Sequence, residues 1–409
     1  MKILHTADWH LGKWLGPFSR IEEQKEVLDE ICHIANDQQV DLVLVAGDLF
    51  DTFNAPTEAV DLLYKTLKRL TNNGTRPVIA IAGNHDSPER IEAPDPLAKE
   101  CGIFFVGYPN TLLEPISLES GIQITKADKG FLEIQLPKFT YPIRCIVTPY
   151  ANAMRMKASL SLENEEQELR ELLGSYWKHL ADTYCDKNGV NLLATHLYVS
   201  IEGGIQPEEP EDEKPILHIG GAQAIFTKQI PEQMQYVALG HLHRFQTVSK
   251  TPCPVVYSSS PLCYSFSEAG QKKKVVLVEL EPGKEAITTP IELQKGKTLS
   301  RKRFESIADA VTWLEANQDH LVELTIVSET YLSSEDRKSL SAAHQGIVAI
   351  IPEIKNQGTG LESKLPTIDL SKSMESLFAD YFTHTKKQAP PESIVQLFKE
   401  LLAEDSTAL

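Results

Sequence analysis

Five short apolar segments of this 409-residue chain are each followed by polar side chains that can bind metals. The segments cover residues 2–5, 42–46, 78–82, 191–194 and 236–239, and they have the length and composition of buried strands. The side chains that follow them are Asp8, His10, Asp48, Asn84, His85, His196, His241 and His243. In open α/β sheets, sites form where the carboxyl ends of the strands meet. The pattern therefore predicts an α/β fold in which these strand ends build one site.

The segments between these strands have helical or hairpin patterns. Residues 19–35 begin with a capping box, Ser19 with Glu22, and continue with apolar residues at helical spacing. Pro56 suits the first turn of a second helix, residues 121–136 resemble a hairpin, and residues 162–184 have an acidic amphipathic pattern. This order is typical of βαβ units with added antiparallel strands.

The composition changes after Pro282, which indicates further domains. Residues 290–352 contain one helical pattern (307–317) and two strand patterns (322–327 and 346–352), and we expect a small α+β domain there. The predicted organisation is a first domain at 1–283, a small domain at 284–354, a linker at 355–370 and two amphipathic helices within 371–409. A basic patch lies in the small domain, with a solvated loop as the alternative interpretation; its residues are Lys295, Lys297, Arg301, Lys302 and Arg303.

The ligand types at the strand ends favour a pair of divalent cations. Two Asp, one Asn and four His fit two hard-to-borderline ions, whereas a structural zinc site would use cysteine. Residues two apart in a strand point the same way, so we expect Asp8 with His10, and His241 with His243, to act together. Four other histidines are interpreted as ordinary core or surface residues: His5, His33, His179 and His218.

Charge and composition limit the class of protein. The net charge of −17 argues against nucleic-acid binding, because phosphate contacts need Lys and Arg. No apolar stretch approaches the length of a membrane span, and residues 1–10 do not have a signal-peptide pattern. The six cysteines form no C-x-x-C pair, so we expect reduced thiols and a cytoplasmic location, without a membrane.

The order of the motifs, D-x-H, GD, GNH, H and GHxH, resembles that of the calcineurin-like metallophosphoesterase superfamily. Within it, LHTADWHLGK, VAGDLFDT, AGNHDSPER, ATH, ALGHLHRFQ and YSSSPLCYSFSE resemble the SbcD family of bacterial nuclease subunits, over essentially the whole chain. Ser259 departs from the pattern, since this family often has Gly at that position. The resemblance implies a metallophosphoesterase β-sandwich flanked by helices, with a capping domain and C-terminal helices.

The resemblance also implies a dinuclear centre with two Mn²⁺. Asp8, His10, Asp48 and His243 would hold one ion, and Asp48, Asn84, His196 and His241 the other, with Asp48 bridging. His85 would donate a proton to the leaving oxygen. Asp51, the second Asp of GDLFD, would orient His85, with Asp86 as the other candidate.

The activity that the resemblance implies is DNA cleavage: 3′→5′ exonuclease action on duplex ends and endonuclease opening of hairpins, in repair, recombination and replication. The enzyme would act near the nucleoid with an SMC-like ATPase, SbcC, as a homodimer within a heterotetramer. The basic patch would contact DNA. The ATPase would bind the C-terminal helices through Leu377, Phe378, Tyr381, Phe382, Leu397, Phe398 and Leu401, although a helical hairpin packed on the capping domain would also bury these residues.

Two other functions remain open from the sequence. A small-molecule phosphodiesterase or protein phosphatase of the same superfamily would suit the acidic charge. A non-catalytic scaffold protein with a relic metal site is the other.

Overall fold

The structure is a computed structural model of the whole chain. It describes residues 1–156, 165–204, 207, 225–329 and 332–354, and a few residues nearer the C-terminus, namely 377–378, 381–382, 390–391, 394–396 and 398. The chain divides into two compact units, Met1–Glu353 and Ile354–Leu409.

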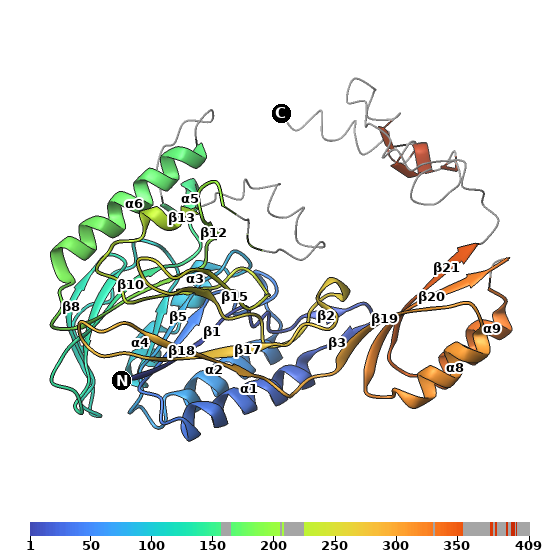
Figure 1. Cartoon of the computed structure of the whole chain (residues 1–409), viewed down its shortest axis with the longest axis horizontal. Helices are drawn as coiled ribbons and strands as arrows, with labels where there is room; N and C mark the ends of the chain where they lie inside the picture. Colours follow the sequence, from blue (N-terminus) through green and yellow to red (C-terminus); the bar gives the residue numbers. More distant parts are fainter. Residues whose placement is uncertain are drawn as a thin grey trace. The chain divides into compact units, whose positions relative to one another are not determined.

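Two sheets form the centre of the first unit (Figure 1). The first has six strands in the order β18 (Ile287–Glu292), β17 (Lys274–Glu279), β1 (Lys2–Thr6), β4 (Leu42–Ala46), β5 (Val78–Ile81) and β6 (Ile103–Val106). The second has eight, in the order β15 (Gln246–Ser249), β16 (Val255–Tyr257), β14 (Tyr236–Leu239), β11 (Val190–Thr195), β10 (Ile143–Thr148), β9 (Phe131–Gln135), β8 (Gln123–Asp128) and β7 (Ile116–Ser117). Strands β1, β4, β5 and β6 run parallel, as do β10, β11, β14 and β16. The predicted α/β fold is therefore confirmed.

The two sheets pack face to face. Ile3 and Ile79 of the first sheet share one buried cluster with Ile134 and Leu192 of the second. Because the parallel strands are covered on both faces, they are apolar throughout rather than alternating. The expected β-sandwich is present in this structure.

Helices cover the outer face of each sheet. The helices α1 (Ile21–Asp37) and α2 (Thr57–Leu70) bury Leu28 and Leu67 against the first sheet, and α6 (Glu165–Tyr184) buries Trp177 against the second. The predicted capping box is wrong: α1 has Arg20 at its N-cap without a side-chain cap. Shorter elements connect these layers, namely α3 (Pro88–Glu92), α4 (Asp95–Glu100), α5 (Ala153–Met156), η1 (Thr227–Gln229), η2 (Phe266–Glu268) and the strand pairs β2–β3 (Trp14–Leu15 with Phe18–Ser19) and β12–β13 (Val199–Ser200 with Ile225–Phe226).

A third sheet with two helices follows the sandwich. Its strands are β19 (Thr298–Phe304), β20 (His320–Ser328) and β21 (Ile347–Ile354), and its helices are α8 (Ile307–Ala316) and α9 (Ser334–Ala343). The sequence pattern predicts one helix here but does not predict α9, which is polar and buries only Leu340. The strand β18 lies beyond the expected boundary at residue 283, yet it pairs with β17 in the first sheet.

The second unit has few described residues. The Phe378 ring stacks on Phe398, with 4.1 Å between ring centroids, and Phe382 lies 5.9 Å from Phe378. Pro391 O accepts from the N–H groups of Ile394 and Val395, as at the start of a helix. The two predicted aromatic segments therefore contact each other, while Leu397, Leu401 and the expected linker lie outside the described residues.

Candidate metal centre

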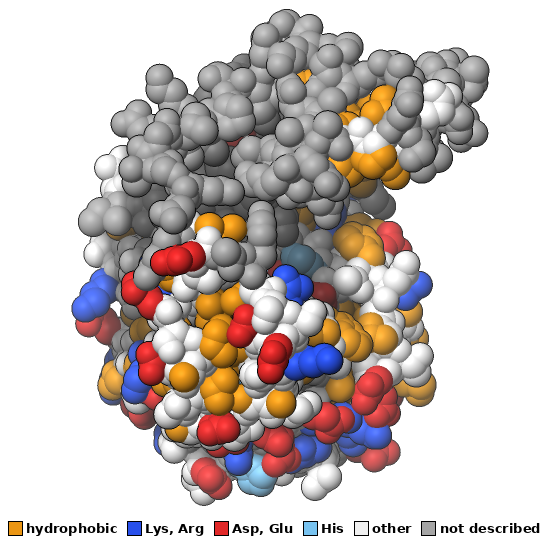
Figure 2. All heavy atoms as spheres, turned by 90° about the vertical axis from the view of Figure 1, so that its right-hand side faces the viewer, with side chains coloured by type: hydrophobic (Ala, Val, Ile, Leu, Met, Phe, Trp, Pro, Cys, Tyr) orange, Lys and Arg blue, Asp and Glu red, His pale blue; other side chains and the backbone are white. Residues whose placement is uncertain are grey.

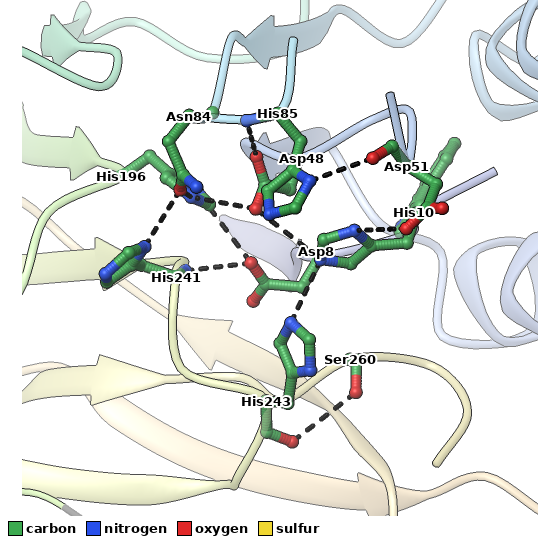
Figure 3. Close-up of polar contacts among 12 residues, drawn as sticks. Asp8, His10, Asp48, Asp51, Asn84, His85, His196, His241, His243 and Ser260 are labelled. Atoms are coloured by element: carbon green, nitrogen blue, oxygen red, sulfur yellow. Dashed lines mark hydrogen bonds and ion pairs between the residues drawn. The ribbon is translucent and has the colours of Figure 1, made fainter. Parts of the chain in front are cut away.

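The polar residues singled out in the sequence come together at one edge of the sandwich (Figure 3). Strands β1, β4 and β5 of the first sheet lead into Asp8 and His10, Asp48, and Asn84 with His85. Strands β11 and β14 of the second sheet lead into His196, and into His241 with His243. The site lies where the carboxyl ends of parallel strands from both sheets meet, as this kind of sheet predicts.

The backbone after β1 explains how Asp8 and His10 reach the site. Strand β1 ends at Thr6, and Asp8 and His10 have left-handed φ angles of 55° and 44°. Their N–H groups donate to the carbonyls of Gly47 (2.9 Å) and Asp48 (3.0 Å). The expectation that strand alternation aims these two side chains together is therefore wrong. Left-handed turns, which cost of order 1 kcal/mol each, aim them instead.

Asp48 lies at the centre of the site. Its Oδ2 is 3.5 Å from His10 Nε2 and 3.3 Å from His196 Nε2, and its Oδ1 accepts from the His85 N–H at 2.9 Å. A Cβ at residue 83 would lie 2.0 Å from Asp48 Oδ1, so this position requires Gly83. The Asp48 carboxylate thus lies between two histidines that come from different sheets.

Two groups of ligand atoms surround Asp48. On one side, His10 Nε2 and His243 Nε2 are 2.9 Å apart, close to Asp8. On the other, Asn84 Oδ1 is 3.0 Å from both His196 Nε2 and His241 Nδ1. Asp8 Oδ2 is buried and has no hydrogen-bond partner among the described residues. Converging nitrogens, facing oxygens and a buried carboxylate oxygen without a donor are what a pair of divalent cations would complement.

The electrostatics of the site agree with cation binding. Burial raises the pKa of Asp8 to about 6, although the neighbouring His196 and His243 act to lower it. Burial acts to lower the pKa of His196, but the Asp48 and Asp8 carboxylates outweigh it and raise this pKa to about 9. The site is therefore a buried group of carboxylates that attracts positive charge.

The structure orients His85 differently from the sequence prediction. His85 Nδ1 donates to the main-chain carbonyl of Asp51 at 2.8 Å, and not to the carboxylate of Asp51 or Asp86. The Asp51 carboxylate instead pairs with Lys13 Nζ at 2.8 Å and lies 3.5 Å from His10 Nδ1. Burial opposes ionisation of Asp51, yet His10 and Lys13 lower its pKa to about 2.

The other candidate, Asp86, joins the two loops that carry Asp48 and Asn84. It is fully buried and accepts from the N–H groups of Leu49 (3.0 Å), Phe50 (2.9 Å) and Gly83 (2.8 Å). Asp86 is not the cap of the helix that follows, since Ser87 is the N-cap of α3.

Sequence reasoning missed one buried cation at the site. Arg155 donates to the carbonyls of Gly83 (2.7 Å) and Asp86 (2.9 Å), and so fixes the loop that carries Asn84 and His85. Arg155 lies in α5, in a segment without a recognisable motif, so no pattern in the sequence pointed to it.

The histidines that the sequence analysis left out of the site lie in ordinary environments wherever they are described. His5 is buried between Tyr236 Oη (2.8 Å) and Leu239 O (3.1 Å), while His33 and His179 are exposed on α1 and α6. His218 lies outside the described residues. All six cysteines are unpaired, as expected.

Two of the five basic side chains of the predicted patch are paired with acids. Arg301 binds Glu323, Arg303 binds Glu353 at 2.8 Å, and Lys302 lies over the Trp313 ring. Figure 2 shows basic and acidic side chains interspersed over the described part of this face. Lys295 and Lys297 lie in the loop before β19, and their N–H groups bind Glu30 and Glu23. Arg301, Lys302 and Arg303 are exposed, but they lie in strand β19 and not in the solvated loop of the alternative interpretation.

The sequence profile of the calcineurin-like phosphoesterases matches residues 1–245. The chain is 37% identical over 410 residues to SbcD, the nuclease component of the SbcCD complex, of Bacillus subtilis (strain 168), covering 98% of this chain and 97% of that protein. It is 33% identical over 281 residues to the protein of the same name from Staphylococcus epidermidis, covering 69% of this chain and 66% of that protein. No helix among the described residues is long and apolar enough to cross a membrane.

Proposed function

Because the chain belongs to the calcineurin-like phosphoesterases and, within them, to the SbcD family, we propose that it is a metal-dependent DNA nuclease. The proposed activity is 3′→5′ exonucleolytic cleavage from duplex ends and endonucleolytic opening of hairpins. We place it in DNA repair, recombination and replication, near the nucleoid in the cytoplasm.

One observation carries this proposal: carboxylate, amide and imidazole groups from five strand ends converge around Asp48. A relic site in a scaffold protein would have no reason to retain this geometry. The left-handed backbone at Asp8, His10, Asp48 and His241 has a cost in stability, and such strain usually occurs at functional sites.

Two Mn²⁺ ions are the cofactors that we propose. Asp8, His10 and His243 would hold the first ion, Asn84, His196 and His241 the second, and Asp48 would bridge them. The mixed nitrogen and oxygen donors suit Mn²⁺, and Asn84 would bind through the amide oxygen that faces both histidines. When bound, two such cations hold phosphate oxygens and acidify the attacking water.

His85 is the proposed proton donor. The carbonyl of Asp51 accepts a hydrogen bond from Nδ1 of His85. The other ring nitrogen, Nε2, is therefore the one that can donate a proton to the leaving oxygen. The His85 N–H also holds Asp48 Oδ1, which couples the position of the acid to that of the bridging carboxylate. Asp86 and Arg155 fix this loop through hydrogen bonds to the main chain of Gly83.

The proposed partner is an SMC-like ATPase, since the named relatives are components of an SbcCD nuclease. The aromatic segments around Phe378 and Phe398 would dock on it, in a heterotetramer that contains two copies of this chain. Lys295 and Lys297 remain our candidates for DNA contacts, with Arg301, Lys302 and Arg303 available only if their present contacts open.

The test is Mn²⁺-dependent cleavage of hairpin and blunt-ended DNA by the purified protein, with and without the ATPase. We expect hairpin and end cleavage that disappears with a chelator and increases on duplexes when the ATPase turns over ATP. The net charge of −17 favours a small substrate instead. Cleavage of a chromogenic diester without any cleavage of DNA would support that alternative and contradict our proposal.

The bridging role of Asp48 is testable by metal content. We expect Asp48→Ala to lose both ions, because both ligand groups depend on this carboxylate, and Asn84→Ala to weaken one ion more than the other. Mn²⁺ titration followed by electron paramagnetic resonance measures both. Two ions bound by Asp48→Ala with wild-type affinity would show that the bridging assignment is wrong.

A further inference from the structure

The motif YSSSPLCYSFSE contains none of the proposed metal ligands. It does place a buried carboxylate next to the proposed ligand His243. Glu268 lies at its end, in η2, and is fully buried. Lys273, five residues later, is 6% exposed. Burying an isolated charge has a large cost in free energy, so a buried Glu–Lys pair next to the centre needs an explanation.

Lys273 holds the main chain of His243. Its Nζ donates to His243 O at 2.8 Å and to Ser260 Oγ at 3.0 Å, and it forms a short ion pair with Glu268 Oε2. The pair therefore adds no net charge to a region that already contains the carboxylates of Asp8 and Asp48.

Glu268 faces the ring of the same histidine. Its Oε1 is 3.5 Å from His243 Nδ1 and is fixed by the N–H groups of Tyr264 and Ser265, each at 3.1 Å. A carboxylate next to Nδ1 favours the tautomer with the hydrogen on Nδ1. That tautomer leaves the Nε2 lone pair directed toward His10 Nε2, 2.9 Å away, where the first cation would lie.

The other histidine of the first ion has the same arrangement. Asp51 Oδ1 is 3.5 Å from His10 Nδ1 and is paired with Lys13. At the second ion, the hydrogen-bond partner of His196 Nδ1 is the neutral main-chain carbonyl of Ala46 at 2.8 Å, and the nearest carboxylate, that of Asp8, is farther away at 3.8 Å. Carboxylate partners raise the basicity of an imidazole ligand more than a neutral carbonyl does.

We propose that Glu268, charge-balanced by Lys273, is a positioning residue that holds His243 with Nε2 toward the first cation and so sets the affinity of that cation alone. This inference rests on the proposed dinuclear centre, and it gives a role to the part of the motif that binds no metal.

The test uses the full-length protein and Mn²⁺ titration monitored by electron paramagnetic resonance. Wild type is expected to bind two ions. Glu268→Gln is expected to weaken one of them by roughly 10- to 100-fold, the usual effect of removing a partner of a metal-bound histidine, and to leave the other unchanged. Glu292→Gln is the matched control, since Glu292 forms an exposed pair with Lys272 at 2.9 Å, far in sequence from any proposed ligand.

A double variant separates positioning from folding. Glu268→Gln leaves Lys273 buried without its partner, so part of any loss could come from instability. Glu268→Gln/Lys273→Met removes that charge, and we expect its melting temperature to recover toward wild type while the affinity at one ion stays low. If both variants bind two ions with wild-type affinity, the inference is overturned. If wild type itself does not bind two ions, the proposed centre fails as well.

Discussion

Ser259 has a backbone conformation that is unfavourable for serine, with a φ of 85°. Its side chain explains why the position tolerates a Cβ. Ser259 Oγ accepts from the Lys274 N–H at 2.9 Å and lies 3.1 Å from Lys274 O, so it ties the loop after β16 to the start of β17. Glycine would avoid the strain but lose this hydrogen bond.

The first prediction compares two substitutions at this position. Ser259→Ala keeps the strain and loses the hydrogen bond, whereas Ser259→Gly loses the bond and relieves the strain. We expect the Gly variant to be more stable than the Ala variant by about 1 kcal/mol, the reverse of the usual order. Urea unfolding measures this difference. An Ala variant as stable as the Gly variant would mean that the left-handed conformation is not maintained.

The second prediction concerns His85. His85→Asn should retain both ions, because the proposed role is proton donation, and should lower cleavage by about 100-fold or more. Metal content and nuclease rate need to be measured on the same preparation. His33→Asn, which changes an exposed histidine on α1, is the control. Loss of metal from His85→Asn would move His85 into the ligand set.

The sequence was sufficient to find the members of the site but not their partners. Asp8, Asp48 and His196 could be selected because each follows an apolar strand, and strand ends converge for geometric reasons. The contact of His85 with the Asp51 carbonyl could not be found, because any residue type provides a main-chain carbonyl. Arg155 contacts the loop at Gly83 and Asp86 only in the folded chain, and no pattern in the sequence around Arg155 predicts these contacts.

At the scale of elements, buried strands were easier to predict than polar helices. Strands such as β4 and β5 are apolar along their whole length, and nothing else in the chain competes with that pattern. Helix α9 has a capping box from Ser333 to Asp336 but buries only Leu340, so its periodicity is weak. The sequence misplaces the N-cap of α1 partly because of a contact that is distant in sequence. The N-cap residue Arg20 donates to Cys263 O as well as to the nearby Glu23.

The third prediction concerns the contact between β1 and β14, one from each sheet. His5 Nε2 donates to Leu239 O and its Nδ1 accepts from Tyr236 Oη, so the neutral ring satisfies both partners. Burial lowers the pKa of His5 to about 3. The unfolded chain therefore binds a proton near pH 6.5 that the folded protein does not, and stability must fall as the pH falls below 6.5.

We expect His5→Gln, which keeps both hydrogen bonds but cannot titrate, to lose less stability in acid. Between pH 6 and 5, its free energy of unfolding should decrease less than that of wild type, by up to about 1.4 kcal/mol per pH unit. Urea unfolding at pH 7, 6 and 5 measures this difference. Parallel pH profiles for the two proteins would show that His5 titrates in the folded state.

At the scale of the whole molecule, the net charge of −17 limits how this chain can hold DNA. In the described face of the small domain, Arg301 and Arg303 are already paired with acids. A long basic track of the kind that binds DNA without help is therefore not available there, and affinity for duplexes would have to come largely from the cations and from a partner. This makes the proposed docking segments important for the activity on duplexes.

The last prediction removes those segments. Phe378 packs on Phe398, while Tyr381 remains 68% exposed, so the pair of segments buries part of its apolar surface and leaves part available to another chain. Helices commonly bind partners by placing such an apolar face in a groove. We expect deletion of residues 371–409 to leave Mn²⁺-dependent cleavage of single-stranded or small substrates unchanged, and to abolish co-purification with the ATPase and ATP-dependent degradation of duplexes. The melting temperature is the control: because residues Met1–Glu353 form a separate compact unit, it should not change. A truncated protein that co-purifies with the ATPase as well as the full chain does would show that the partner binds elsewhere.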